Sequence, residues 1–143
     1  MAGILIITSI ISLPSKLIAV DSIPPGMELI QSSDVLITPT KESMKATVYK
    51  LAKEYGVNPE VMINVINCEN TDWIPGLQSR IITKTGEREK SYGLAQIHLP
   101  SHPHITIKQA SSPEFAIEFM AKEMSMGKAS KWSCYNKIYK NHL

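Results

Sequence analysis

The sequence predicts a mainly α-helical domain of four or five helices with at most a small β-hairpin. Apolar residues recur at helical spacing in several segments, helix-start and helix-stop residues bracket these segments, and only one short stretch has strand-like character. The chain has 143 residues, of which 43% are hydrophobic and 20% charged, so one domain with a real core is expected. The net charge of +2 is too balanced to indicate a nucleic-acid partner.

The N-terminal residues differ in composition from the rest of the chain. Residues 1–20 open with the apolar run "MAGILIITSIISL", whose length suits a signal peptide. Because no Lys or Arg precedes the run, a short membrane anchor is the second interpretation, and a buried N-terminal element of the domain is the third. Residues 21–39 are rich in proline and are expected to be a linker to a domain over residues 40–143. We therefore expect an exported protein that contacts a membrane, if at all, through residues 1–20.

The first helix is expected to begin at Thr40, which is a suitable N-cap, and to stop at Gly56. Apolar residues recur within it at intervals of three and four and form one face of the helix: Met44, Val48, Leu51 and Tyr55.

The second helix is expected to follow at once, with Asn58 as N-cap and Pro59 in its first turn. Apolar residues cover much of its circumference, so it should be buried on most sides. Glu69 falls four residues after Val65 and therefore shares the apolar face. Desolvation at such a position raises the pKa of a carboxyl and favours a general acid. The alternative is a helix-terminal glutamate that turns into solvent or pairs with a nearby Lys or Arg.

Residues 74–90 are polar and irregular, and predict either a short hairpin around "RIITKTGEREK" or a loop. A further helix is marked by the capping-box spacing of Ser111 and Glu114, by Pro113 in its first turn and by Gly127 at its end. The last segment, "ASKWSCYNKIYKN", is short and aromatic and is also expected to be helical.

The chain contains two cysteines, Cys68 and Cys134. In an exported protein such a pair favours a disulfide that closes a long loop. The alternative is two separate buried thiols.

The segment "SYGLAQI" offers groups that suit a saccharide. Gly93 permits close backbone approach, while Tyr92 and Gln96 place polar groups beside apolar surface. Taken alone, the same segment also fits a loop that enters a short helix.

Three motifs, "CEN" at 68–70, "YGLAQI" at 92–97 and "WSCYNKIY" at 132–139, together resemble the lytic transglycosylase family of the soluble-transglycosylase and goose-type-lysozyme kind. That family carries a Glu-Ser pair at the end of a buried helix, a Gly-Leu-Met-Gln motif downstream and a tyrosine-containing motif on a later helix. The resemblance covers roughly residues 50 to 140 and implies a lysozyme-like domain.

The resemblance implies specific site residues. Glu69 matches the catalytic acid/base, and Asn70 stands where the family most often has serine. Gly93 and Gln96 belong to the second motif, in which Ala95 replaces methionine. Tyr135, or Tyr139, corresponds to the later tyrosine that contacts the catalytic region. Together with Tyr92, these residues form the expected substrate-binding set: Asn70, Tyr92, Gly93, Gln96 and Tyr135.

The family's activity is cleavage of the β-1,4 bond between N-acetylmuramic acid and N-acetylglucosamine in peptidoglycan, with formation of a 1,6-anhydromuramyl product and no second carboxylate. A hydrolytic muramidase would need a partner carboxylate, for which the sequence offers Asp72, Glu87 and Glu89. Two other interpretations are a non-catalytic peptidoglycan-binding module and a structural component of a secretion or pilus apparatus.

Peptidoglycan glycan strands are thus the expected partner, and we expect a monomer without a cofactor. No metal is expected at "HLPSHPH", because the spacing of His98, His102 and His104 matches no helix-based zinc motif. Trp73 and Trp132 are either sugar platforms or core residues.

Overall fold

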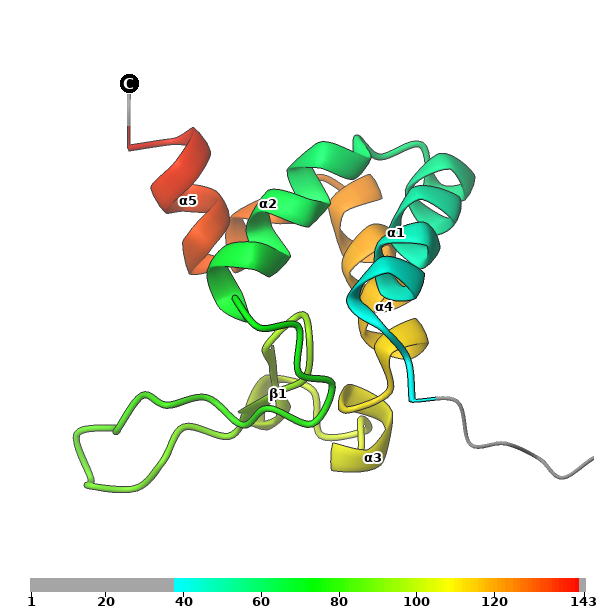
Figure 1. The fold of residues 1–143 in the computed structure, drawn as a ribbon. Coiled ribbons are helices and arrows are strands. Elements are labelled where there is room, and N and C mark those ends of the chain that lie inside the picture. The colour runs from blue at the N-terminus through cyan, green and yellow to red at the C-terminus, as the bar shows by residue number, and fades with distance from the viewer. Residues whose placement is uncertain (1–37, 142–143) are drawn as a thin grey trace, which may run out of the picture. The chain divides into compact units, whose positions relative to one another are not determined.

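The computed structural model describes residues 38–141, which form five α-helices, two 3-10 turns and one two-stranded antiparallel sheet (Figure 1). The prediction of a mainly helical domain with a small hairpin is confirmed. The expected signal peptide or anchor at 1–20 and nearly all of the expected linker lie outside the described residues. Within 38–141, no helix has the length and hydropathy that a membrane span requires.

Helix α1 (Lys41–Tyr55) begins and ends where its caps predict. The Thr40 hydroxyl accepts a hydrogen bond from the backbone N–H of Ser43 at 3.1 Å, and Gly56 closes the helix with a φ of 67°. Helix α2 (Pro59–Glu69) is capped by Asn58 and buries most of its apolar residues. These two helices pack against each other, and α1 also packs along α4 (Pro113–Ser125).

Ser112, rather than Ser111, is the N-cap of α4, because its hydroxyl accepts from the backbone N–H of Phe115. A short helix, α3 (Ile107–Ala110), precedes it, and the chain ends in α5 (Ser133–Tyr139), which packs on α2. The 3-10 turns are Leu99–Ser101 and Ala129–Lys131.

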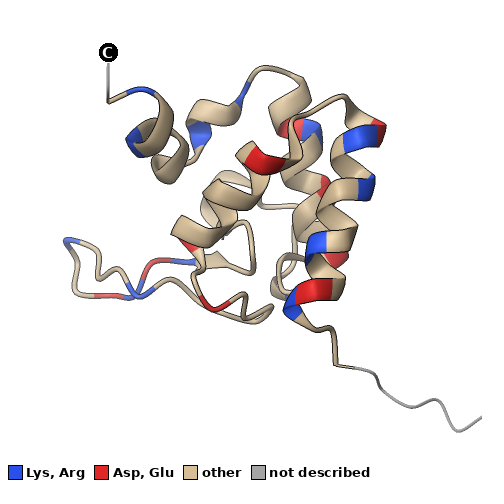
Figure 2. Cartoon of the chain, turned by 45° about the horizontal axis from the view of Figure 1, so that its top comes forward, with Lys and Arg blue, Asp and Glu red and all other residues tan. Residues whose placement is uncertain are grey.

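The sheet forms downstream of the segment for which the sequence suggested a hairpin. Strand β1 (Ser91–Tyr92) pairs with β2 (Ile97–His98), and the turn between them is "GLAQ". Residues 74–90, called the arm below, contain only isolated bridges, including one between Ile82 and Arg88. The arm extends away from the helices in Figure 1, and Figure 2 shows that it carries both basic and acidic residues.

The core joins the apolar faces of α1, α2 and α4 to the turn of the sheet. Its most buried side chains include Val48, Val65, Leu94 and Met120, each of which is 0% exposed. The turn enters this core at Gly93, whose φ of 80° is unfavourable for other residues. A Cβ built on Gly93 would lie 1.8 Å from the carbonyl oxygen of Ala110. The glycine therefore lets the sheet turn pack directly on the end of α3.

A disulfide between Cys68 and Cys134 joins the end of α2 to the first turn of α5. The sequence left two buried thiols as an alternative, and the structure forms the disulfide instead. The two cysteines are 66 residues apart, so the bond closes a long loop of the chain. A loop of this length is expected to stabilise the folded state by about 4 kcal/mol, mainly by restricting the unfolded chain.

We expect Gly93→Ala to lower the free energy of unfolding by more than about 3 kcal/mol, because the new Cβ overlaps the Ala110 carbonyl and the backbone conformation disfavours it. Gly86→Ala is the matched control, since Gly86 also has a positive φ of 82° but has no atom within 4 Å of the added Cβ. The control should lose only about 1 to 2 kcal/mol. Urea unfolding of both variants measures the difference, and equal losses would contradict the packing described here.

Replacing Cys68 and Cys134 together by alanine is expected to lower the free energy of unfolding by about 4 kcal/mol. The measurement is urea unfolding of the variant beside the oxidised wild type. Dithiothreitol should destabilise the wild type by a similar amount and leave the variant unaffected. A loss below about 1 kcal/mol would mean that the disulfide adds little constraint.

Candidate active site

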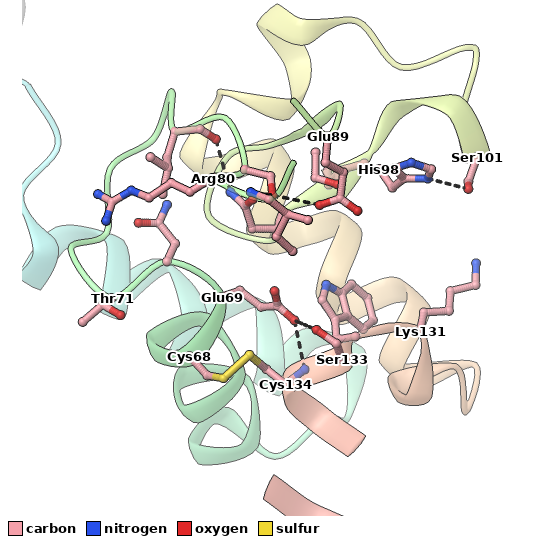
Figure 3. Close-up of a pocket in the computed structure, with 18 of the residues that line it drawn as sticks. Cys68, Glu69, Thr71, Arg80, Glu89, His98, Ser101, Lys131, Ser133 and Cys134 are labelled. Atoms are coloured by element: carbon pink, nitrogen blue, oxygen red, sulfur yellow. Dashed lines mark hydrogen bonds between the residues drawn. A yellow bond between two sulfur atoms is a disulfide. The ribbon is translucent and has the colours of Figure 1, made fainter. Parts of the chain in front are cut away.

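A cavity of about 820 Å³ opens between the end of α2, the arm, the sheet and the start of α5. Its volume lies in the range of pockets that bind small ligands or segments of polymers. Figure 3 shows Glu69 and Ser133 on one side of it, and Arg80, Glu89 and His98 on the other. The cavity therefore places ionisable groups from distant parts of the sequence around one space.

Glu69 is the last residue of α2, and its half-buried carboxyl borders this cavity. Oε1 accepts hydrogen bonds from the backbone N–H of Cys134 at 3.1 Å and from the Ser133 hydroxyl at 3.3 Å. Burial raises the pKa of Glu69; the two donors act against this rise, and the charge of Glu89 adds to it. A carboxyl that keeps its proton above its ordinary pKa and faces a cavity is suited to donate that proton.

The three carboxylates considered as partners for this acid occupy different places. Glu89 borders the cavity, is half-buried, and accepts a hydrogen bond from the Ser79 hydroxyl at 2.8 Å. Asp72 also borders the cavity, but its side chain is 63% exposed and lies 4.0 Å from Arg80. Glu87 is exposed on the arm and does not line the cavity. Glu89 is therefore the carboxylate best placed to act with Glu69.

The motif residues after the acid hold the turn of the sheet in place. Asn70 is 1% exposed; its amide nitrogen donates to the carbonyls of Ile74 at 2.7 Å and Gly93 at 3.2 Å, and its amide oxygen accepts from the Ile74 N–H. The Gln96 amide donates to the carbonyls of Gly93 at 2.9 Å and Leu77 at 3.2 Å. Both side chains line the cavity, yet the hydrogen bonds that they make go to backbone and shape its wall.

The tyrosines expected to contact substrate lie away from the cavity. Tyr92 is half-buried in β1 and packs against the core, and it is not among the cavity-lining residues. Tyr135 is in α5 and packs against Tyr139, with 5.2 Å between ring centroids. The hydroxyl of Tyr139 accepts a hydrogen bond from the Asn64 side chain at 3.0 Å. Neither Tyr135 nor Tyr139 lines the cavity.

The sequence assigned no role in this site to other polar residues of the cavity. Ser133 donates to Glu69, Lys131 lines the cavity and pairs with Glu123, and His98 Nδ1 shares a 2.9 Å hydrogen bond with the Ser101 hydroxyl. For Ser133 a signal existed, because pairing Cys68 with Cys134 places the neighbouring residues beside Glu69. For the others no local pattern pointed to a shared cavity.

The two tryptophans both belong to the core. Trp73 is 1% exposed, and its indole N–H donates to the Asn67 side chain at 2.7 Å. Trp132 is 6% exposed and donates to the carbonyl of Ala95 at 2.8 Å, but it also lines the cavity. Of the two, Trp132 is the one that a ligand in the cavity would meet.

Within residues 38–141, no group of three or more His, Cys, Asp or Glu side chains is placed to hold a metal ion. His102 and His104 face each other edge to face, with 6.1 Å between ring centroids. His102 also packs on Phe119.

Comparisons of the chain with models of protein families, with curated proteins and with solved structures find no match. The resemblance to lytic transglycosylases therefore rests on the three motifs, and the function is argued from the geometry of the cavity.

We expect Glu69→Gln to raise the free energy of unfolding near neutral pH. Folding raises the pKa of Glu69, so the unfolded chain releases this proton at a lower pH than the folded protein does. Between these two pKa values, the free energy of unfolding of the wild type falls as the pH rises. Glutamine keeps an acceptor for the Cys134 N–H and has no charge to desolvate. The gain should vanish below about pH 4, where the glutamate is protonated in both states.

Thermal unfolding from pH 3 to pH 8 measures this dependence. Glu87→Gln is the matched control, since it removes the same charge from an exposed site on the arm. A stability difference for Glu69→Gln that does not vary with pH would contradict the desolvation argument.

Proposed function

We propose that the chain cleaves the β-1,4 bond between N-acetylmuramic acid and N-acetylglucosamine in peptidoglycan. One observation carries the proposal: a half-buried carboxyl with a raised pKa, Glu69, borders a cavity of about 820 Å³. Cleavage of a glycosidic bond requires an acid that protonates the leaving oxygen, and a carboxyl of this kind supplies it.

The reaction needs Glu69 in two roles. As an acid, Glu69 protonates the glycosidic oxygen while positive charge develops at C1 of the muramyl residue. As a carboxylate, it then accepts the proton of the muramyl 6-hydroxyl, whose oxygen attacks C1 and closes a 1,6-anhydro ring. The proton returns to Glu69, so no water is consumed and no second carboxylate is required. The donors from Cys134 and Ser133 stabilise the carboxylate formed between the two steps.

Hydrolysis is the second candidate, and the position of Glu89 favours considering it. Glu89 borders the same cavity, and its charge acts on the pKa of Glu69. A carboxylate across the cavity can activate a water molecule or stabilise the developing positive charge. In this case the product would carry a reducing end and be heavier by one water.

The proposed substrate places the protein outside the cytoplasm, facing the cell wall. An exported location fits the disulfide, because disulfides persist in oxidising compartments. Peptidoglycan strands are the proposed partner, and no cofactor takes part in the proposed reaction.

We expect Glu69→Gln to lower the rate of glycan release from purified peptidoglycan by at least about 100-fold, because glutamine cannot transfer the proton. The full-length wild type, with its disulfide formed, should release fragments that mass spectrometry identifies as ending in 1,6-anhydromuramic acid. Glu87→Gln serves as the control and should retain wild-type activity. Retention of most activity by Glu69→Gln would refute the assignment.

Glu89→Gln separates the two candidate reactions. If Glu69 acts alone, the variant should keep the anhydro product and most of its rate. Loss of activity, together with reducing-end products from the wild type, would establish hydrolysis with Glu89 as partner. If the wild type releases nothing, the chain is not an enzyme of this kind, and a binding module or assembly component replaces the proposal.

A further inference from the structure

The two antiparallel segments of the arm have a register that defines its two faces. The backbone N–H of Glu89 donates to the carbonyl of Ile81 at 2.9 Å, and Ile82 bridges Arg88. Successive side chains of an extended segment point to opposite sides. The register therefore places Ile81 with Glu89 on one face of the arm, and Ile82 with Arg88 on the other.

The first face borders the cavity that contains Glu69. Three residues of the arm on this face, and one of the adjoining strand β1, line the cavity: Ser79, Ile81, Glu89 and Ser91. Both charged residues of this face, Glu87 and Glu89, are acidic. A ligand in the cavity would thus meet this side of the arm.

The second face, called the outer face below, carries one apolar and three basic side chains: Ile82, Lys84, Arg88 and Lys90. All four are exposed, and none of them lines the cavity. Figure 2 shows basic positions along the arm out to its far end. The three basic residues take part in no ion pair among residues 38–141. Their charges therefore remain available to a ligand.

This arrangement is unfavourable for the free protein. Lys84 and Lys90 are the nearest neighbours of Arg88 on the outer face, so three positive charges repel one another with no negative charge among them. Ile82 is 60% exposed between them and gains little from burial. A ligand that stabilises this face has to supply both negative charge and an apolar phase.

A membrane surface with anionic lipids has both properties. Lipid phosphates attract basic side chains near the surface, and the boundary between headgroups and acyl chains accepts an apolar side chain. A soluble polyanion would neutralise Lys84, Arg88 and Lys90 but would leave Ile82 in water. The exposed isoleucine among the basic residues therefore favours a membrane.

We propose that the outer face of the arm docks the protein on a membrane surface that contains anionic lipids. Lys84, Arg88 and Lys90 contact lipid phosphates, and Ile82 enters the interface. The cavity borders the opposite face of the arm, so this contact leaves the cavity accessible. The sequence placed membrane contact only in residues 1–20, and the arm adds a second contact that does not depend on the proposed enzymatic function.

The first test measures binding of the full chain to two kinds of vesicle by sedimentation. One kind is phosphatidylcholine alone, and the other is phosphatidylcholine mixed with phosphatidylglycerol in equal parts. The wild type should bind the anionic vesicles at least about tenfold more tightly at about 0.1 M salt, and this preference should fall as salt is added. Residues 1–20 are identical in every variant, so the ratio of the two affinities reports on the arm.

The triple variant Lys84→Gln/Arg88→Gln/Lys90→Gln should lose this preference and bind both kinds of vesicle equally. Equal binding of the wild type to both vesicles, or an unchanged ratio in the triple variant, would overturn the proposal.

The matched control is Lys50→Gln/Lys108→Gln/Lys137→Gln, which removes three positive charges from exposed positions outside the arm. Its preference for anionic vesicles should equal that of the wild type. A loss as large as that of the arm variant would mean that binding follows net charge and not the outer face. Thermal unfolding of both triple variants checks that the fold is kept.

Tryptophan fluorescence tests the role of Ile82. The natural tryptophans, Trp73 and Trp132, are 1% and 6% exposed, so a change in emission reports mainly on an added tryptophan. Anionic vesicles should shift the emission of Ile82→Trp to the blue and leave that of Ile81→Trp, on the opposite face, unchanged. Equal shifts in the two variants would refute the assignment of the face. Binding that requires the basic residues but gives no shift in Ile82→Trp would indicate a polyanion site in place of a membrane contact.

Discussion

The hydrogen bond from the backbone N–H of Cys134 to the Glu69 carboxyl joins α5 to the end of α2 on one side of the candidate site. It exists because the disulfide holds the first turn of α5 against the last turn of α2, where Cys68 precedes Glu69. Helix α5 is short and buries only Cys134. Its attachment to α2 therefore depends strongly on the disulfide. The position of the Ser133 hydroxyl and the orientation of the Glu69 carboxyl depend on the disulfide as well. The disulfide thus acts as part of the site as well as a general stabiliser.

The opposite wall depends on a different constraint, the close approach of backbone at Gly93. The turn between β1 and β2 lies directly on Ala110, and this contact excludes any side chain at position 93. Asn70 and Gln96 use their amides on the carbonyl of Gly93, which ties the turn to the residue after the acid. Asn70 and Gln96, which the motifs predicted to contact substrate, thus make hydrogen bonds that hold the backbone of the turn in place. These supports fix the turn and the first residues of the arm, whereas Ile81 and Ile82 farther along the arm are more than half exposed.

Local patterns in the sequence predicted most of the helices, because caps and apolar spacing are local. Thr40, Asn58 and Gly56 act as the patterns indicated. The position of Glu69 at the end of a buried helix was also readable. The pairing of the sheet was not, since two-residue strands carry no alternation to detect. The sequence also did not show which of the three candidate carboxylates lies at the cavity, because contacts across such long loops leave no local trace, and it indicated Ser133 only through the pairing of Cys68 with Cys134. Tyr135 shows the opposite error: a motif placed it near the site, but its ring packs on Tyr139 instead.

The same burial that suits Glu69 for acid chemistry weakens the fold near neutral pH, because a desolvated carboxylate is unfavourable in the folded state. The domain described here is small, and its core rests on three main helices. A small core leaves little stability in reserve for an unfavourable charge. The disulfide offsets this loss at the residue next to the one that causes it. Reduction of the bond would remove the stabilisation together with the covalent constraint that holds the Cys134 N–H against Glu69, so stability and site geometry depend on the same covalent link.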